Sequence, residues 1–209
     1  DFLKERGASR EIRGLLGEKL HATRGSEGLM AGLCHPSKVL RNLVLTEMKE
    51  FQVPPDPFAA SDGTATKLKQ IAGDGAERWY TRCAAILSLV QIAQMDHCKK
   101  GRAEVLQWLL ERMQNLQGNE DIHHALVSGL GILLTSSEED REGGDGYIDL
   151  SGQDEAVLLR FLEESSSSVL VKALSDLKAH SVGLADWVVS KQSIERNDWP
   201  TKHVLLLCS

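Results

Sequence analysis

Apolar residues recur along this chain at helical spacing, and one such segment returns twice at an offset of 41 residues. The three copies are Arg41–Met48, Arg82–Leu89 and His123–Leu130. Apolar residues coincide at four aligned positions: Leu43/Ala84/Ala125, Val44/Ala85/Leu126, Leu45/Ile86/Val127 and Met48/Leu89/Leu130. Apolar positions three and four residues apart form one face of a helix. The pattern therefore predicts three equivalent amphipathic helices, whose register continues at Phe51, Ile92 and Leu133.

Further helical segments surround these copies and are separated by turn signals. The pattern predicts helices at 28–36, 37–51, 67–72, 76–93, 103–116, 121–134, 154–162 and 169–180. Residues 1–24 are also amphipathic, although three glycines within them weaken the helical pattern. The apolar positions of this first segment are Phe2, Leu3, Ile12, Leu15, Leu16 and Leu20. The sequence therefore predicts an all-α fold.

Two stretches between these helices are predicted to be flexible loops. Pro54, Pro55 and Pro57 are followed by an Asp-Gly step, and this combination cannot continue a helix. The segment 136–146 is acidic and rich in Gly and Ser, so it cannot bury enough apolar area to offset its ordering entropy. We therefore expect loops at 52–66 and 135–153.

The repeated helix resembles the first helix of a HEAT or armadillo repeat, in which a charged residue precedes small residues. The residues that carry the resemblance are Arg82–Leu89 and, within Ile122–Leu134, Ala125, Gly129 and Gly131. A period of about 40–47 residues is that of the helix pairs in these repeats. The resemblance covers residues 37–134 and, more loosely, 154–180, and it lacks the family's usual proline in the first helix. It implies an irregular HEAT-like stack of antiparallel helix pairs, an α-solenoid or helical array, with a protein-binding or scaffolding role.

Composition limits the class of protein further. The chain has 209 residues, of which 42% are hydrophobic and 26% are charged, and this is enough for the core of one large domain. We expect a single domain over 1–209, and its start at Asp1 indicates a fragment of a longer protein. No window approaches the ~18 uninterrupted apolar residues of a membrane span. The net charge of −6 argues against nucleic-acid binding, because neutralised phosphates supply most of that affinity.

The cysteines suggest a compartment and one alternative function. The four of them are Cys34, Cys83, Cys98 and Cys208. They are too scattered for a disulfide framework in a chain of this length, so we expect an intracellular protein, cytoplasmic or nuclear. Cys98 follows His97, and three basic residues within 99–102 would lower the pKa of the Cys98 thiol. The same cations also suit the C-terminal end of a helix, where they complement its dipole. A helical enzyme or enzyme accessory domain with a reactive Cys98 or Cys34 is therefore the alternative hypothesis.

No motif for a metal or a cofactor is complete in the sequence. Asp145–Asp149 looks like the second half of an EF-hand loop, but Arg141 and Gly152 would occupy its first and last ligand positions. Cys34-His35 and His97-Cys98 contain zinc-ligand types without the spacing of structural zinc sites. Nucleophile-elbow, P-loop and dinucleotide-binding motifs are also absent from the sequence. We expect neither a metal nor a cofactor.

Five aromatic residues are candidates for partner binding: Trp79, Tyr80, Trp108, Trp187 and Trp199. Exposed aromatic side chains dominate binding hot spots, although most aromatic residues lie in protein cores. The expected function is that of a scaffold or adaptor whose helical-repeat surface binds a protein partner. The acidic loop at 135–153 would favour a basic segment or helix of that partner.

Overall fold

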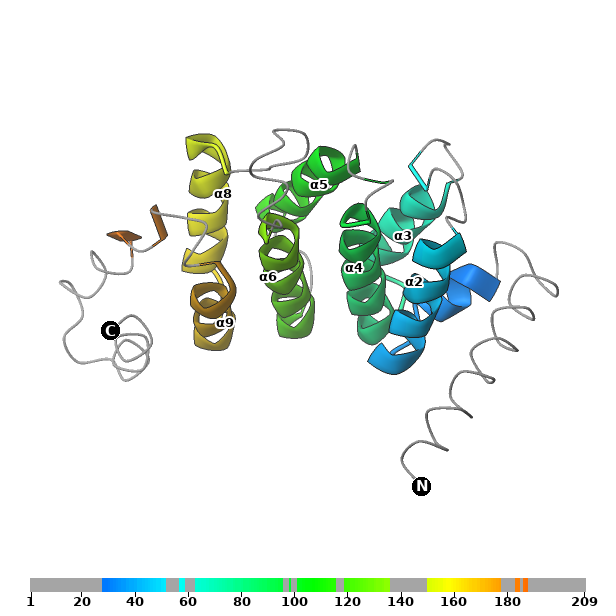
Figure 1. Ribbon diagram of the computed structural model, residues 1–209. Helices are drawn as coiled ribbons and strands as arrows, with labels where there is room; N and C mark the ends of the chain where they lie inside the picture. The colour runs from blue at the N-terminus through cyan, green and yellow to red at the C-terminus, as the bar shows by residue number, and fades with distance from the viewer. Residues whose placement is uncertain are drawn as a thin grey trace, which may run out of the picture. The chain divides into compact units, whose positions relative to one another are not determined.

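The computed structural model describes residues 28–51, 57–58, 63–95, 98, 101–115, 119–135, 150–177, 183–184 and 186–187 (Figure 1). All regular secondary structure in these residues is helical, which confirms the all-α class. The chain divides into two compact units, Asp1–Cys98 (unit 1) and Lys99–Ser209 (unit 2), and each is described here by itself. A single domain over 1–209 and a HEAT-like stack stay predictions.

The three copies of the repeated segment are helices that begin at equivalent residues. They are α2 (Lys38–Phe51), α4 (Trp79–Ala93) and α6 (Glu120–Leu134), and their first residues lie 41 positions apart. Three of the aligned positions are buried in every copy: Val44/Ala85/Leu126, Leu45/Ile86/Val127 and Met48/Leu89/Leu130. The predicted apolar face of each helix is therefore confirmed.

Unit 1 packs its helices around α4. Both α2 and α3 (Thr64–Gly73) lie against α4, and residues 28–33 form a further short helix. A Cβ atom at Gly32 would lie 2.6 Å from Cγ2 of Val44, so glycine permits the close approach of this short helix to α2. Inside the unit, the Ser88 hydroxyl donates a buried hydrogen bond of 2.7 Å to the carbonyl oxygen of Leu33. Residues 28–33 are thus fixed to both α2 and α4.

Unit 2 contains two layers of helices. One layer contains α5 (Arg102–Gln114) and α8 (Gly152–Glu163), which pack against each other, and the other contains α6 and α9 (Ser167–Leu177). The layers are joined because α5 also packs against α6. A Cβ atom at Gly131 would lie 2.9 Å from Cβ of Asp176, so a small residue lets α6 approach α9. Each of the eight helices predicted from the sequence has a counterpart among the described residues. These counterparts are the short helix at 28–33 and α2, α3, α4, α5, α6, α8 and α9.

Several predicted boundaries are wrong by a few residues. α3 begins at Thr64 and α8 at Gly152, so the ends of the predicted loops 52–66 and 135–153 are helical. α4 begins at Trp79 rather than 76, because the Asp74 carboxylate accepts a hydrogen bond of 2.9 Å from the backbone N–H of Ala76 and holds a turn there. Residues 52–56 and 136–149 lie outside the described residues.

The start of α8 has a specific cause. The Ser151 hydroxyl accepts a hydrogen bond of 3.2 Å from the backbone N–H of Asp154, and the Asp154 carboxylate accepts one of 3.1 Å from the backbone N–H of Ser151. This capping box satisfies two N–H groups at the helix N-terminus. Leu150, directly before it, is buried. The box therefore ends the predicted loop before residue 153.

Candidate protein-binding surface

A cleft of about 480 Å³ opens in unit 2, between the C-terminal end of α5 and one face of α8. The described residues that line it are Met113, Gln114, Asn115, Gln153, Ala156, Val157, Arg160 and Phe161. Its lining residues come from two helices of unit 2 that pack against each other.

The floor of the cleft is apolar and its rim carries side-chain amides. Met113 and Phe161 are fully buried, while Gln114, Asn115 and Gln153 are exposed. A carboxamide carries both hydrogen-bond donors and an acceptor, which match the N–H and C=O groups of a peptide backbone. The Asn115 amide already uses one donor, in a hydrogen bond of 2.8 Å to the carbonyl oxygen of Glu111. Such a site can take an apolar side chain into its floor and bind the adjoining main chain at its rim.

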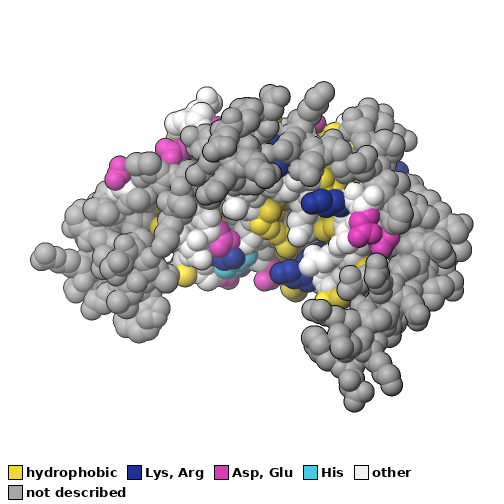
Figure 2. Space-filling view, viewed as in Figure 1, with side chains coloured by type: hydrophobic (Ala, Val, Ile, Leu, Met, Phe, Trp, Pro, Cys, Tyr) yellow, Lys and Arg dark blue, Asp and Glu magenta, His cyan; other side chains and the backbone are white. Residues whose placement is uncertain are grey.

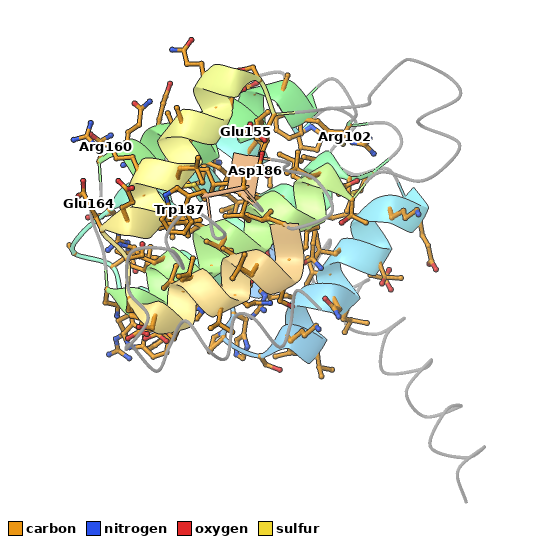
Figure 3. All side chains as sticks on the ribbon, turned by 90° about the vertical axis from the view of Figure 1, so that its left-hand side faces the viewer. Arg102, Glu155, Arg160, Glu164, Asp186 and Trp187 are labelled. Carbon is orange, nitrogen blue, oxygen red and sulfur yellow. The ribbon has the colours of Figure 1, made fainter. Side chains whose placement is uncertain are left out.

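Arg160 is the one charged side chain among the described residues that line this cleft. Its side chain is 81% exposed, and its Nε lies 3.5 Å from Oε1 of Glu164, one helical turn away. Figure 3 shows both side chains projecting from the same side of α8. An exposed ion pair contributes little to stability. The guanidinium group can therefore exchange Glu164 for a carboxylate on a ligand at small cost.

A histidine lies behind the floor of the cleft. The ring of His123, on α6, meets the ring of Phe161 edge to face, with 5.0 Å between centroids. Its Nε2 atom is buried and has no hydrogen-bond partner among the described residues. Burial lowers the pKa of His123, and the nearby Glu120 carboxylate opposes this shift. A neutral imidazole therefore supports the position of Phe161.

Two of the predicted aromatic residues lie together in unit 1. Trp79 is 49% exposed at the start of α4, and its ring meets that of Tyr80 edge to face at 5.7 Å. The Arg78 guanidinium donates a hydrogen bond of 2.6 Å to the Tyr80 hydroxyl. Trp79 and Tyr80 thus form a small exposed aromatic cluster, and their role in partner binding stays a prediction.

The other three predicted aromatic residues belong to unit 2. Trp108 is only 8% exposed, because it lies on the buried face of α5, and the Arg112 guanidinium lies 5.5 Å from its ring. Trp108 is thus part of the buried core of unit 2, and its role in partner binding stays a prediction. Trp187 is half-buried, and its indole N–H donates a hydrogen bond of 3.2 Å to Glu163 on α8 (Figure 3). Trp199 lies outside the described residues.

A Ser–His–Glu cluster joins the N-terminal ends of α6 and α9. The hydroxyls of Ser166 and Ser168 both donate hydrogen bonds to Oε1 of Glu120, and Ser168 Oγ lies 2.9 Å from Nε2 of His124. These bonds lower the pKa of Glu120, that from Ser168 most strongly. In a nucleophilic triad the carboxylate orients the imidazole, whereas here it binds the hydroxyls directly. The cluster therefore acts as a tie between two helices.

One of the two cysteines in the alternative hypothesis, Cys34, is not an activated thiol. Cys34 is buried, and burial, followed by the charge of Glu77, raises the pKa of its thiol to about 11. Cys98 is buried as well. A thiol reacts as its thiolate, so Cys34 is unreactive at neutral pH. No three His, Cys, Asp or Glu side chains in the described part of the chain are grouped so that they would hold a metal ion.

The amide rim of the cleft was not predicted from the sequence. Gln114, Asn115 and Gln153 resemble ordinary solvated residues at helix ends, and only the packing of α5 against α8 brings them together. Buried Met113 and Phe161 follow the helical apolar pattern, but that pattern does not mark them as the floor of a cleft. No local signal in the sequence would have identified this site.

Comparison with known proteins adds no assignment: no family model, no curated protein and no solved structure matches this chain. Among the described residues, no helix is both long and apolar enough to cross a membrane.

Proposed function

We propose that this chain is a protein-interaction domain, a scaffold or adaptor, that binds a peptide or helix of a partner in the α5–α8 cleft. The observation that carries the proposal is the chemistry of the cleft: a buried apolar floor beneath a rim of three exposed amides. Ligand sites with this character combine apolar burial for affinity with a few polar groups for orientation. The helices that form the cleft are fixed by the core of unit 2, so the site is pre-formed.

Binding would use each part of the cleft differently. An apolar side chain of the partner would contact Phe161 and Met113, and the rim amides would bind the partner's main chain. Arg160 would bind a carboxylate of the partner in place of Glu164. The acidic segment at 136–146 would add a preference for a basic stretch elsewhere in the same partner.

The charge distribution favours a protein partner over a nucleic acid. The chain has a net charge of −6. On the face shown in Figure 2, the Lys and Arg side chains of the described residues lie among Asp and Glu rather than in one basic strip. The scattered positions of the cysteines in the sequence, Cys34, Cys83, Cys98 and Cys208, suit a reducing compartment, the cytoplasm or the nucleus.

The test is a quantitative affinity capture from cell lysate with a matched pair of variants. Ala156→Arg places a long side chain in the cleft from an exposed helical position, and Arg is nearly as good a helix former as Ala. Gln107→Arg adds the same side chain at an exposed position of α5 outside the cleft. Mass spectrometry then compares the captured proteins for the wild type and both variants.

The proposal expects at least one protein whose capture falls about tenfold with Ala156→Arg, a loss of about 1.4 kcal/mol in binding. Capture of the same protein by Gln107→Arg should equal that of the wild type. If both variants capture the same proteins as the wild type, the α5–α8 cleft is not the binding site.

A further inference from the structure

His123 connects α6 to the floor of the α5–α8 cleft. Its ring meets the ring of Phe161 edge to face, with 5.0 Å between centroids. Phe161 is buried and lines the cleft, whereas His123 is half-buried, so water can reach part of its side chain. Side chains in a close-packed interior move together when one of them moves. A change in the position of His123 is therefore transmitted to the floor of the cleft.

The Nε2 atom of His123 is the unstable part of this contact. It is buried and has no hydrogen-bond partner among the described residues. In a neutral imidazole one ring nitrogen stays an acceptor, whereas in an imidazolium both nitrogens carry a proton. Protonation would therefore create a charged N–H group at a buried position where no described residue accepts its hydrogen bond. Such a group has a high free energy, because it loses its water without gaining an acceptor.

A protonated His123 has a more favourable position outside this contact. Glu120 lies three residues before it on α6, and residues three apart are neighbours on the surface of a helix. Burial lowers the pKa of His123, the Glu120 carboxylate opposes this shift, and the charge of His124 adds to it. A turn of the side chain toward Glu120 would give the imidazolium an acceptor. The same turn would take the ring away from Phe161.

The charges that shift the pKa of this histidine come from its own helix, α6. Charged side chains on the elements around α6 have other partners. On α8, Arg160 lies 3.5 Å from Glu164, and on α9, Lys172 lies 2.6 Å from Asp176. On α5, the Arg112 guanidinium lies 5.5 Å from an aromatic ring of the same helix. The carboxylate at the start of α6 is therefore the acceptor toward which the imidazolium would turn.

We propose that His123 is a proton-sensitive support for the floor of the α5–α8 cleft. The neutral imidazole holds Phe161 in place, and the protonated ring turns toward Glu120, so that the cleft loses its apolar floor. The cleft is then complete at neutral pH and weakens as the pH falls below 6.5, the ordinary value for histidine. Control of peptide binding by this change rests on the proposed function, whereas the movement of Phe161 does not.

Fluorine NMR of the full chain, labelled with para-fluorophenylalanine, tests the movement without any partner. The chain contains four Phe residues, and Phe161→Leu assigns the Phe161 resonance. The shift of that resonance between light and heavy water measures the access of water to the ring, at about pH 7.5 and about pH 5.5. His123→Leu removes the titrating group. His124→Gln removes the neighbouring imidazole, which lies 2.9 Å from the Ser168 hydroxyl, and is the matched control.

The proposal expects the solvent isotope shift of Phe161 to rise about twofold at the lower pH in the wild type and in His124→Gln. It should stay constant in His123→Leu. A constant shift in the wild type overturns the proposal, as does an equal rise in His123→Leu. Circular dichroism should be the same at both pH values, and a loss of helix in the wild type also overturns the proposal, because the floor would then be lost by general unfolding.

Control of binding is measured by affinity capture at the same two pH values. A protein whose capture is lost with Ala156→Arg should be captured about fivefold less by the wild type at the lower pH. This decrease should be absent from His123→Leu. If Phe161 moves but no captured protein depends on Ala156, the proposed function fails and the support by His123 stands. If such a protein is captured equally at both pH values, the cleft binds it and control by His123 is overturned.

Discussion

Arg82 donates a hydrogen bond of 3.0 Å from its Nε to the carbonyl oxygen of Ala72 near the C-terminal end of α3. Arg41, at the aligned position of the repeat, donates bonds of 2.8 Å to the carbonyl oxygens of both His35 and Pro36. Each arginine is the fourth residue of its helix and binds carbonyls of the segment before it. The last carbonyls of a helix have no partner within it, so the repeated arginine meets a recurring structural need.

Replacement of Arg82 by Met is therefore expected to destabilise unit 1. Met retains much of the aliphatic stem and removes the donor, so the loss should be about 1–2 kcal/mol in the free energy of unfolding. Urea denaturation followed by circular dichroism measures it. Gln70→Met, at an exposed position of α3, is the matched control and should change the stability by less than about 0.5 kcal/mol. Equal stability of the two variants would show that the Arg82 bond contributes nothing.

Gly131→Ala is expected to destabilise the packing of α6 on α9. The added Cβ would lie 2.9 Å from Cβ of Asp176 and 3.2 Å from its backbone oxygen, and the backbone cannot move without shifting α9. We expect a loss of about 1–3 kcal/mol in the free energy of unfolding.

The control for Gly131 is a second glycine at a helical position of the same unit. A Cβ atom at Gly152, the first residue of α8, would meet nothing within 4 Å. Gly152→Ala should therefore stabilise the protein by roughly 0.5–1 kcal/mol, because alanine loses less conformational freedom on folding. Thermal unfolding that moves both variants in the same direction would contradict the close approach at Gly131.

His123 is expected to make the stability of unit 2 depend on pH. Burial lowers the pKa of His123 in the folded chain below the ordinary value of 6.5, so the unfolded chain binds the proton more readily. The contribution of this group is therefore complete above about pH 6.5 and is lost as the pH falls below that value.

His123→Leu removes the titrating group and keeps an apolar contact with Phe161. Urea denaturation at about pH 7.5 and about pH 5 compares the wild type with this variant. The wild type should lose more stability than His123→Leu between the two conditions. Equal losses would show that protonation of His123 does not oppose folding.

The repeated helices could be predicted because their apolar positions are local and periodic, and helix starts at Lys38, Trp79 and Glu120 keep the repeat. Helix ends depend on capping bonds that the apolar pattern does not contain. The capping box at Ser151 and Asp154 is a local sequence pattern, so the start of α8 was predictable from the sequence. The burial of Trp108 was also visible, since it lies three residues after Val105 on the same stripe.

The candidate sites depend on contacts between distant residues, which periodicity cannot supply. Ser166 and Ser168 reach Glu120 across 46 and 48 residues of sequence. At the third aligned position, His123 replaces the arginine and packs on Phe161 instead of binding a carbonyl. The same repeat position therefore serves different interactions, according to which element lies against it.

Cys34 is expected to resist alkylation in the folded chain. Its pKa of about 11 leaves very little thiolate at neutral pH, and its side chain is buried. Treatment with iodoacetamide at about pH 7.5, followed by peptide mass spectrometry, should leave Cys34 unmodified for as long as the chain stays folded. The same treatment in urea should modify it, which controls for detection of its peptide. Rapid modification of the folded chain would favour the reactive-cysteine hypothesis over the interaction domain, because only an activated and accessible thiolate reacts at that rate.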